Sequence, residues 1–220
     1  GRDADLTVLD DAVRSAQRRV SAPFEVHGHA VHLGCSVGVA IAPDDGRAAA
    51  DLLAHAETAL HAAKEAGAGT VRYYSSQLDR LAVERMTLRS ELSGALARDE
   101  IELHFQPQAR LGDGSLFGVE ALARWTHPVW GPVAPDRFVP EAERSGQIVA
   151  LGAAVRRKAL EQLRRWRRAG IACARIAVNV SARELEEEDW LDSVLADLSA
   201  LDLTPGDLEI EITETTAMTV

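Results

Sequence analysis

Short runs with strand-like alternation and longer segments with helical spacing follow one another from residue 101 onward, and this pattern restricts the possible folds more than any other feature. Strand-like runs are expected at residues 101–106, 117–123, 175–180 and 208–213. Helical stretches are expected near residues 137–169 and 182–201. In the first run Ile101, Leu103 and Phe105 share one face, because side chains alternate across a strand. Strands that alternate with helices predict a largely parallel sheet covered by helices.

The residues before this pattern predict a smaller α/β layer followed by a long helix. The expected elements are a helix over residues 5–20, a hairpin over 24–42 interrupted at Gly28, a helix that stops at Gly67 and a strand over 70–74. Residues 75–98 carry leucines at helical spacing among charged residues and predict one connecting helix. The sequence therefore predicts three parts, which span residues 1–74, 75–98 and 99–220.

Composition narrows the functional classes. The sequence has 34 acidic and 24 basic residues, and its net charge of -10 argues against a general nucleic-acid binder. No apolar run approaches the ~18 residues that span a bilayer, and no signal segment opens the sequence, so no membrane segment and a cytoplasmic location are predicted. Cys35 and Cys173 lie in predicted buried strands and lack the spacing of metal ligands.

Polar side chains interrupt each of the four strand-like runs at or near a predicted strand end. They are Gln106, Glu120, Asn179 and Glu211. Because the carboxyl ends of parallel strands face one side of a sheet, these side chains are expected to converge. Their oxygen donors suit a hard cation such as Mg²⁺ or Mn²⁺. From spacing alone, solvated polar residues on strand faces are an equally good interpretation.

Five blocks of sequence support the first interpretation. They are Phe-Gln-Pro (105–107), Gly-Val-Glu-Ala-Leu-Ala-Arg-Trp (118–125), Phe-Val-Pro-Glu-Ala-Glu-Arg-Ser-Gly (138–146), Val-Asn-Val-Ser (178–181) and Glu-Ile-Thr-Glu (211–214). In their order and spacing these blocks resemble the EAL family of cyclic di-GMP phosphodiesterases. The resemblance implies a partial TIM-like (β/α) barrel of the EAL type over residues 99–220.

The resemblance also implies a role for individual residues. Positions similar to metal ligands of the family are Glu120, Asn179 and Glu211. Positions that match contacts to cyclic di-GMP are Gln106, Leu122 and Arg124. The candidate catalytic residues are Glu120 and Glu214, and Glu214 matches a carboxylate that steadies a neighbouring loop. In such enzymes two Mg²⁺ or Mn²⁺ ions activate a water that attacks phosphorus, and the product is linear pGpG.

The sequence also departs from the family pattern. The family's barrel continues beyond the strand of Glu211 into a segment with paired aspartates and a lysine that complete the catalytic machinery, whereas this sequence ends at Val220. We therefore expect a fragment truncated at both ends that carries half of the metal ligands. Such a chain is not expected to hydrolyse cyclic di-GMP by itself.

Two blocks before residue 75 resemble the rear half of a GGDEF (diguanylate cyclase) domain, the usual upstream neighbour of EAL. They are Cys-Ser-Val-Gly-Val-Ala (35–40) and Ala-Leu-His-Ala-Ala-Lys-Glu-Ala-Gly (59–67). Lys64 matches a lysine that contacts nucleotide phosphates in that family, although a solvated lysine at a helix end is at least as good an interpretation. The Gly-Gly-Asp-Glu-Phe loop is absent from the sequence, so cyclase activity is not expected.

Three further sequence patterns resemble functional motifs, but a purely structural interpretation is favoured for each. Residues 34–38 spell the G-x-S-x-G of a hydrolase elbow, which requires a helix directly afterwards, but the sequence continues as a strand. His27, His29 and His32 have no companion ligands and are expected on the surface. The arginine-rich helix over residues 155–168 is typical of nucleic-acid or membrane contacts, but in an acidic protein a solvated outer face is favoured.

The leading hypothesis is a signalling protein that binds metal and cyclic di-GMP. The alternative is a non-catalytic cyclic di-GMP receptor or interaction module. In either case we expect a homodimer that forms through the EAL domain or the connecting helix.

Overall fold

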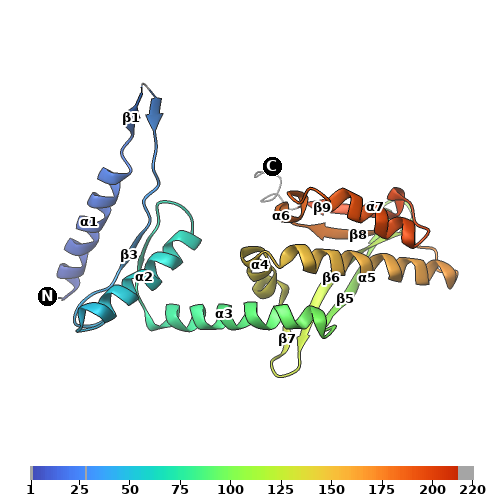
Figure 1. The fold of residues 1–220 in the computed structure, drawn as a ribbon, viewed down its shortest axis with the longest axis horizontal. Helices are drawn as coiled ribbons and strands as arrows, with labels where there is room; N and C mark the ends of the chain where they lie inside the picture. Colours follow the sequence, from blue (N-terminus) through green and yellow to red (C-terminus); the bar gives the residue numbers. More distant parts are fainter. Residues whose placement is uncertain (1, 28, 213–220) are drawn as a thin grey trace. The chain divides into compact units, whose positions relative to one another are not determined.

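The computed structural model describes residues 2–27 and 29–212, which fall in two compact units, 1–85 and 86–220. Figure 1 shows the elements of each unit along the chain. The described helices are α1 (Arg2–Val20), α2 (Ala49–Glu65), α3 (Ser76–Ala97), α4 (Pro135–Ser145), α5 (Ile148–Arg168), α6 (Ala182–Leu185), α7 (Trp190–Ala200) and the 3-10 turn η1 (Pro205–Asp207). The described strands are β1 (Phe24–Val26), β2 (His29–Val31), β3 (Val37–Val39), β4 (Val71–Tyr73), β5 (Ile101–Ala109), β6 (Leu116–His127), β7 (Gly131–Val133), β8 (Arg175–Val180) and β9 (Leu208–Ile212).

In the first unit, α2 packs closely against the parallel pair of β3 and β4. A Cβ atom on Gly38 of β3 would lie 2.2 Å from the carbonyl oxygen of Ala56 and 2.2 Å from the amide nitrogen of Leu60. Only glycine therefore permits the backbone of α2 to approach the strand this closely. Ala59 and Ala63 of α2 are fully buried, so small side chains on the helix complete the close packing.

The hairpin of the first unit is shorter than predicted. β1 pairs antiparallel with β2 over residues 24–31, whereas β3 leaves the hairpin and pairs in parallel with β4. Cys35 lies in the irregular segment before β3 and is only half-buried, so its predicted place in a buried strand is wrong. The side-chain amide of Gln17 in α1 stabilises this segment by donating to the carbonyl oxygens of Cys35 (2.7 Å) and Gly69 (2.8 Å).

The predicted helix over residues 75–98 is present as α3. The division into compact units falls inside it, between Arg85 and Met86. Its buried side chains, Leu88, Leu92 and Ala95, all belong to the second unit. Among the described residues, no helix combines the length and hydropathy that a bilayer span requires.

The sheet of the second unit is mixed, which corrects the prediction of a largely parallel sheet. Its strand order is β5-β6-β8-β9, with β7 paired to β6. The pairs of β6 with β8 and β8 with β9 are parallel, whereas β5 and β7 both run antiparallel to β6. Residues 110–115 connect β5 to β6, and such a short turn permits only an antiparallel pair, because a parallel pair needs a crossover of about a dozen residues or more.

The predicted helical stretches of the second unit are each divided into two helices. The first becomes α4 and α5, because Gly146 ends α4 in the left-handed conformation, with φ of 77°. The second becomes α6 and α7.

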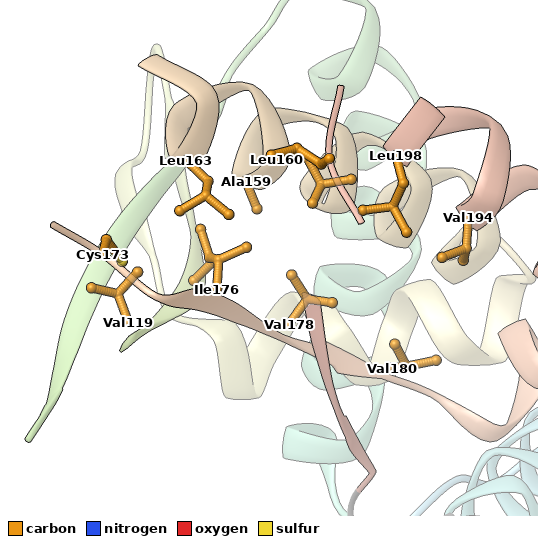
Figure 2. Packing of buried hydrophobic residues seen from close by; sticks show 12 residues of the cluster. Val119, Ala159, Leu160, Leu163, Cys173, Ile176, Val178, Val180, Val194 and Leu198 are labelled. Carbon is orange, nitrogen blue, oxygen red and sulfur yellow. The ribbon is translucent and has the colours of Figure 1, made fainter. Parts of the chain in front are cut away.

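One face of the sheet forms the main core of the second unit against α5 and α7. Figure 2 shows the apolar side chains of β8 pointing toward those of the two helices. The residues in this contact are Ile176, Val178 and Val180 of β8, Ala159, Leu160 and Leu163 of α5, and Val194 and Leu198 of α7. Cys173 lies beside them just before β8 and is buried as predicted, but outside the strand. Each fully buried Leu, Ile or Val side chain contributes about 1.5–3 kcal/mol relative to an exposed one.

Candidate functional site

The opposite face of the same sheet carries most of the predicted site residues. In the strand register Gln106 lies opposite Glu120, Glu120 opposite Ala177, and Asn179 opposite Glu211. Because opposed residues on neighbouring strands point to the same side, these side chains share one face. The polar face is defined here as Gln106 and Gln108 of β5, Glu120, Leu122 and Arg124 of β6, Asn179 of β8, and Glu211 of β9.

The prediction that the four polar residues stand at strand ends is only partly right. Asn179 and Glu211 are the penultimate residues of β8 and β9. Gln106 and Glu120, however, lie inside the long strands β5 and β6. Strand register and side-chain alternation, rather than a shared end of parallel strands, place them on one face.

Two hydrogen bonds from carboxamides hold the two candidate carboxylates. Nδ2 of Asn179 donates to Oε1 of Glu120 over 2.7 Å, and Nε2 of Gln108 donates to Oε1 of Glu211 over 3.3 Å. The second contact joins β5 to β9, which are separated by β6 and β8. The sheet must therefore curl toward its polar face, as a barrel sheet does.

Gln108 was not predicted as a site residue. The signal that identifies it is the period-two pattern of β5, which continues two residues beyond Gln106 and returns Gln108 to the polar face. Its partner on β9 cannot be read from that pattern, because the contact depends on the curl of the whole sheet.

The electrostatics of the polar face favour a bound cation. Burial raises the pKa of the Glu211 carboxyl, and the nearby charges of Glu120 and Glu209 raise it further. Two carboxylates in such proximity oppose each other's ionisation, and a divalent cation between them removes that penalty. Together with the Asn179 amide they provide the oxygen donors that hard cations such as Mg²⁺ and Mn²⁺ prefer. Glu120, Asn179 and Glu211 thus fit a metal site of this kind.

The candidate donor set includes one amide. The part of the chain that the structure describes has no group of three or more His, Cys, Asp or Glu side chains able to hold a metal ion. The candidate donors on the polar face are therefore two carboxylates and the carboxamide of Asn179.

The predicted substrate residues form a row beside the carboxylates. Leu122 and Arg124 follow Glu120 at two-residue intervals along β6, and both side chains are half-buried. Nη1 of Arg124 donates to the carbonyl oxygen of Ala123 over 2.8 Å, which holds the guanidinium close to its own strand. Gln106 is exposed on β5. Glu214, the second predicted catalytic residue, lies outside the described residues.

A buried capping box fixes the turn that follows Asn179. The Ser181 hydroxyl accepts from the backbone of Glu184, and the Glu184 carboxylate accepts from the Ser181 amide over 3.0 Å. Burial raises the pKa of the Glu184 carboxyl, which is 3% exposed. Gly152 of α5 makes room for it, since a Cβ there would lie 1.8 Å from Oε1 of Glu184. The end of β8 is therefore held against α5.

The three histidines, Lys64 and the G-x-S-x-G residues belong to the first unit, whereas the polar face belongs to the second. His27, His29 and His32 are exposed as predicted, and Lys64 is exposed on the last turn of α2. The G-x-S-x-G residues enter β3, and the next described helix after them begins only at Ala49, so they form no hydrolase elbow.

The arginine-rich face of α5 is partly paired with acidic residues. Arg164 pairs with Asp202 (3.2 Å), and Arg167 pairs with Asp207 (2.6 Å). Arg156 is 3% exposed and pairs with Asp197 over 2.9 Å. The predicted solvated outer face is therefore wrong for Arg156, which forms a buried ion pair between α5 and α7.

Taken together, a helix-covered sheet that curls around two carboxylates and a carboxamide defines the class of barrel-type α/β domains with an acidic inner face. Comparison with known families is more specific: the model of the EAL domain matches residues 89–220, and the chain belongs to the EAL domain family. The model of the diguanylate cyclase GGDEF domain matches residues 2–70.

Curated relatives agree with both matches. The bifunctional diguanylate cyclase/cyclic di-GMP phosphodiesterase MucR of Pseudomonas aeruginosa is 37% identical over 201 residues, which are 91% of this chain and 29% of MucR. The cyclic di-GMP phosphodiesterase NbdA of the same organism is 37% identical over 218 residues, 98% of this chain and 28% of NbdA. The chain thus spans less than a third of the length of these relatives.

A solved structure supports the fold. The PaMucR phosphodiesterase in complex with c-di-GMP matches with a TM-score of 0.57 and 42% identity, covering 60% of this chain and 53% of that one. The predicted α/β class, with a TIM-like EAL region preceded by a GGDEF-like region, is therefore confirmed.

Proposed function

We propose that this chain belongs to a cyclic di-GMP signalling protein whose EAL domain binds the dinucleotide with Mg²⁺ or Mn²⁺ and hydrolyses it to pGpG. The observation that carries the proposal is the convergence of Glu120, Asn179 and Glu211 on one face of the curled sheet. The names of MucR and NbdA add support, because both describe cyclic di-GMP phosphodiesterases.

The three converging residues are the proposed metal ligands. When bound, a divalent cation supplies Lewis-acid stabilisation of phosphate oxygens and lowers the pKa of a bound water. Asn179 donates through Nδ2 to Glu120, an orientation that leaves its carbonyl oxygen as the donor atom for a cation. Glu120 is also a proposed catalytic residue, together with the carboxylate of Glu214.

The row beside the carboxylates is the proposed dinucleotide site. The guanidinium of Arg124 is suited to a phosphate oxygen, because it is always charged and presents several N–H donors. The carboxamide of Gln106 can both donate and accept hydrogen bonds, and Leu122 offers apolar surface on β6. These residues would orient the dinucleotide with its phosphodiester toward Glu120.

The proposed division into residues 1–74, 75–98 and 99–220 is supported by α3, which covers residues 76–97, and by the separate GGDEF and EAL matches. The homodimer through the EAL domain or the connecting helix stays a prediction, as does the cytoplasmic location.

The proposal is tested by binding and turnover. Cyclic di-GMP binding is measured on this chain with and without Mn²⁺, and turnover to pGpG on the same chain extended to the length of its EAL relatives. We expect Mn²⁺ to strengthen binding, and Glu120→Ala to remove both that effect and turnover. If cyclic di-GMP binds equally well with and without Mn²⁺ and is not hydrolysed, the non-catalytic receptor is supported instead. If the dinucleotide neither binds nor is hydrolysed, the proposal is wrong.

A further inference from the structure

Gln108 connects the two ends of the curled sheet. It lies on β5, and its Nε2 donates to Oε1 of Glu211 on β9 over 3.3 Å. In a flat sheet, with ~4.8 Å between neighbouring strands, β5 and β9 would be about 14 Å apart. The hydrogen bond therefore exists only because the sheet curls, and it spans the two intervening strands.

Two very small residues lie on the same face of the intervening strands. Gly118 of β6 is the register partner of Gln108, and Ala177 of β8 is the register partner of Glu120. A Cβ on Gly118 would lie 3.1 Å from Oε1 of Gln108 and 3.0 Å from the carbonyl oxygen of Arg175. Ala177 is 0% exposed although it belongs to the polar side of the sheet. The absence of a side chain at Gly118 leaves room for the Gln108 side chain on this face.

The contact has a counterpart at the other carboxylate. Asn179 donates one amide N–H to Glu120, and Gln108 donates one amide N–H to Glu211. Each carboxylate thus has one oxygen oriented by a carboxamide from another strand. These donors act where the two carboxylates repel each other, since the charge of Glu120 opposes the ionisation of Glu211.

From this geometry we infer that Gln108 is a positioning residue, which holds Glu211 in the orientation needed to share one divalent cation with Glu120 and Asn179. The inference rests on the proposed function, because it assigns Gln108 a role at the proposed metal site. The proposed metal site would then depend on Gln108, which is not itself a proposed ligand.

The contact itself is tested without metal by a double-mutant cycle. All four tryptophans, Trp125, Trp130, Trp166 and Trp190, belong to residues 86–220, so tryptophan fluorescence during urea unfolding of the full chain reports on that unit. Gln108→Met keeps the length of the side chain and removes the N–H donor. We expect it to lower the folding equilibrium constant about threefold, and to have no effect when combined with Glu211→Ala. If Gln108→Met had the same effect in the unmodified chain and in Glu211→Ala, Gln108 and Glu211 would not interact.

The positioning role is tested by Mn²⁺ affinity, measured by electron paramagnetic resonance of free Mn²⁺ on the folded chain. We expect Gln108→Met to weaken Mn²⁺ binding about 10-fold, within the range for residues that orient metal ligands. Gln147→Met is the matched control, because it removes an equivalent amide donor, which bonds the carbonyl oxygen of Arg89, and it should change Mn²⁺ affinity less than twofold. Unchanged Mn²⁺ affinity in Gln108→Met, with binding still lost in Glu120→Ala, would overturn the role of Gln108 alone. If the unmodified chain does not bind Mn²⁺, both the proposed metal site and the positioning role of Gln108 are wrong. The double-mutant cycle would still show whether Gln108 and Glu211 interact.

Discussion

The two faces of the sheet in the second unit obey different constraints. The face toward α5 and α7 is packed with apolar side chains, which stabilise the unit through the apolar area that they remove from water. The polar face depends on a few directed contacts, such as Asn179 to Glu120 and Gln108 to Glu211. Loss of one apolar group should therefore reduce stability without altering the site. Loss of one polar group should alter the site with little change in stability.

The largest effect is expected on the apolar face. Leu160 is 0% exposed, and Leu160→Ala should lower the free energy of unfolding of the second unit by about 2–5 kcal/mol, since the change leaves a cavity. Urea unfolding followed by tryptophan fluorescence measures this loss. Leu160→Met, which conserves volume, is the control and should cost less than about 1.5 kcal/mol. If Leu160→Ala also weakened Mn²⁺ binding by the folded protein, the two faces would not be independent.

The converse effect is expected on the polar face. Glu120→Ala should weaken Mn²⁺ binding by at least about 10- to 100-fold, or about 1.4–2.7 kcal/mol, because it removes a proposed ligand. The free energy of unfolding without metal should change by less than about 0.5 kcal/mol, because the lost hydrogen bond from Asn179 is offset by the removal of a half-buried charge that repels Glu211. Calorimetric titration with Mn²⁺ and urea unfolding measure the two quantities. A large loss of stability would contradict the separation of the two faces.

A smaller effect is expected where α5 meets the start of β9. Asp207 accepts from Arg167 over 2.6 Å and from the Thr204 amide over 2.7 Å, and these contacts, with Arg167 first, lower the pKa of its carboxyl. The ionised form is therefore stabilising at pH above the unfolded pKa, and that stability is lost as the pH falls through the lowered folded value. Asp207→Asn should cost about 1 kcal/mol at pH 7, since Arg167 is partly exposed. Urea unfolding at pH 7 and pH 3 should show the difference from the unmodified chain shrinking in acid; an equal difference at both values would exclude the ion pair as its cause.

The smallest effect concerns Glu211. Burial and the neighbouring carboxylates raise the pKa of its carboxyl, so its ionisation opposes folding at pH above the raised value. This destabilisation disappears as the pH falls below the unfolded pKa. Glu211→Gln, which can still accept from Gln108, should therefore raise stability slightly at pH 7 without metal, and the gain should vanish near pH 4. Urea unfolding at the two pH values measures it, and a loss of stability at pH 7 would show that the carboxylate is not strained by its neighbours.

The apolar face could be predicted from the sequence more fully than the polar face. The alternation of Ile101, Leu103 and Phe105 correctly predicts the core side of β5, and the predicted strand over residues 175–180 coincides with β8. Both follow from local periodicity. On the polar face, Glu120, Asn179 and Glu211 stand out as polar interruptions of strand-like runs, but only the family resemblance distinguishes a metal site from solvated strand residues.

What could not be predicted depends on relations between distant segments. The contact between Gln108 and Glu211 requires the strand order and the curl of the sheet. The partner of β3 is β4, 34 residues further along at each register position, so the local alternation over residues 24–42 incorrectly extended the hairpin. The antiparallel pairing of β5 with β6 was predictable in principle, because the turn between them is short.

The register of β5 also restricts how the length of this protein can vary among its relatives. The register between β5 and β6 is continuous up to Gln108 and shifts between Gln108 and Ala109. One residue inserted between Ile101 and Gln108 would turn every later side chain of that segment to the opposite face, exchanging core and site at once. The turn over residues 110–115 lies beyond the shift and tolerates insertions. Insertions and deletions in homologous sequences should therefore collect in that turn, while the distance in sequence between the start of β5 and Gln108 stays constant.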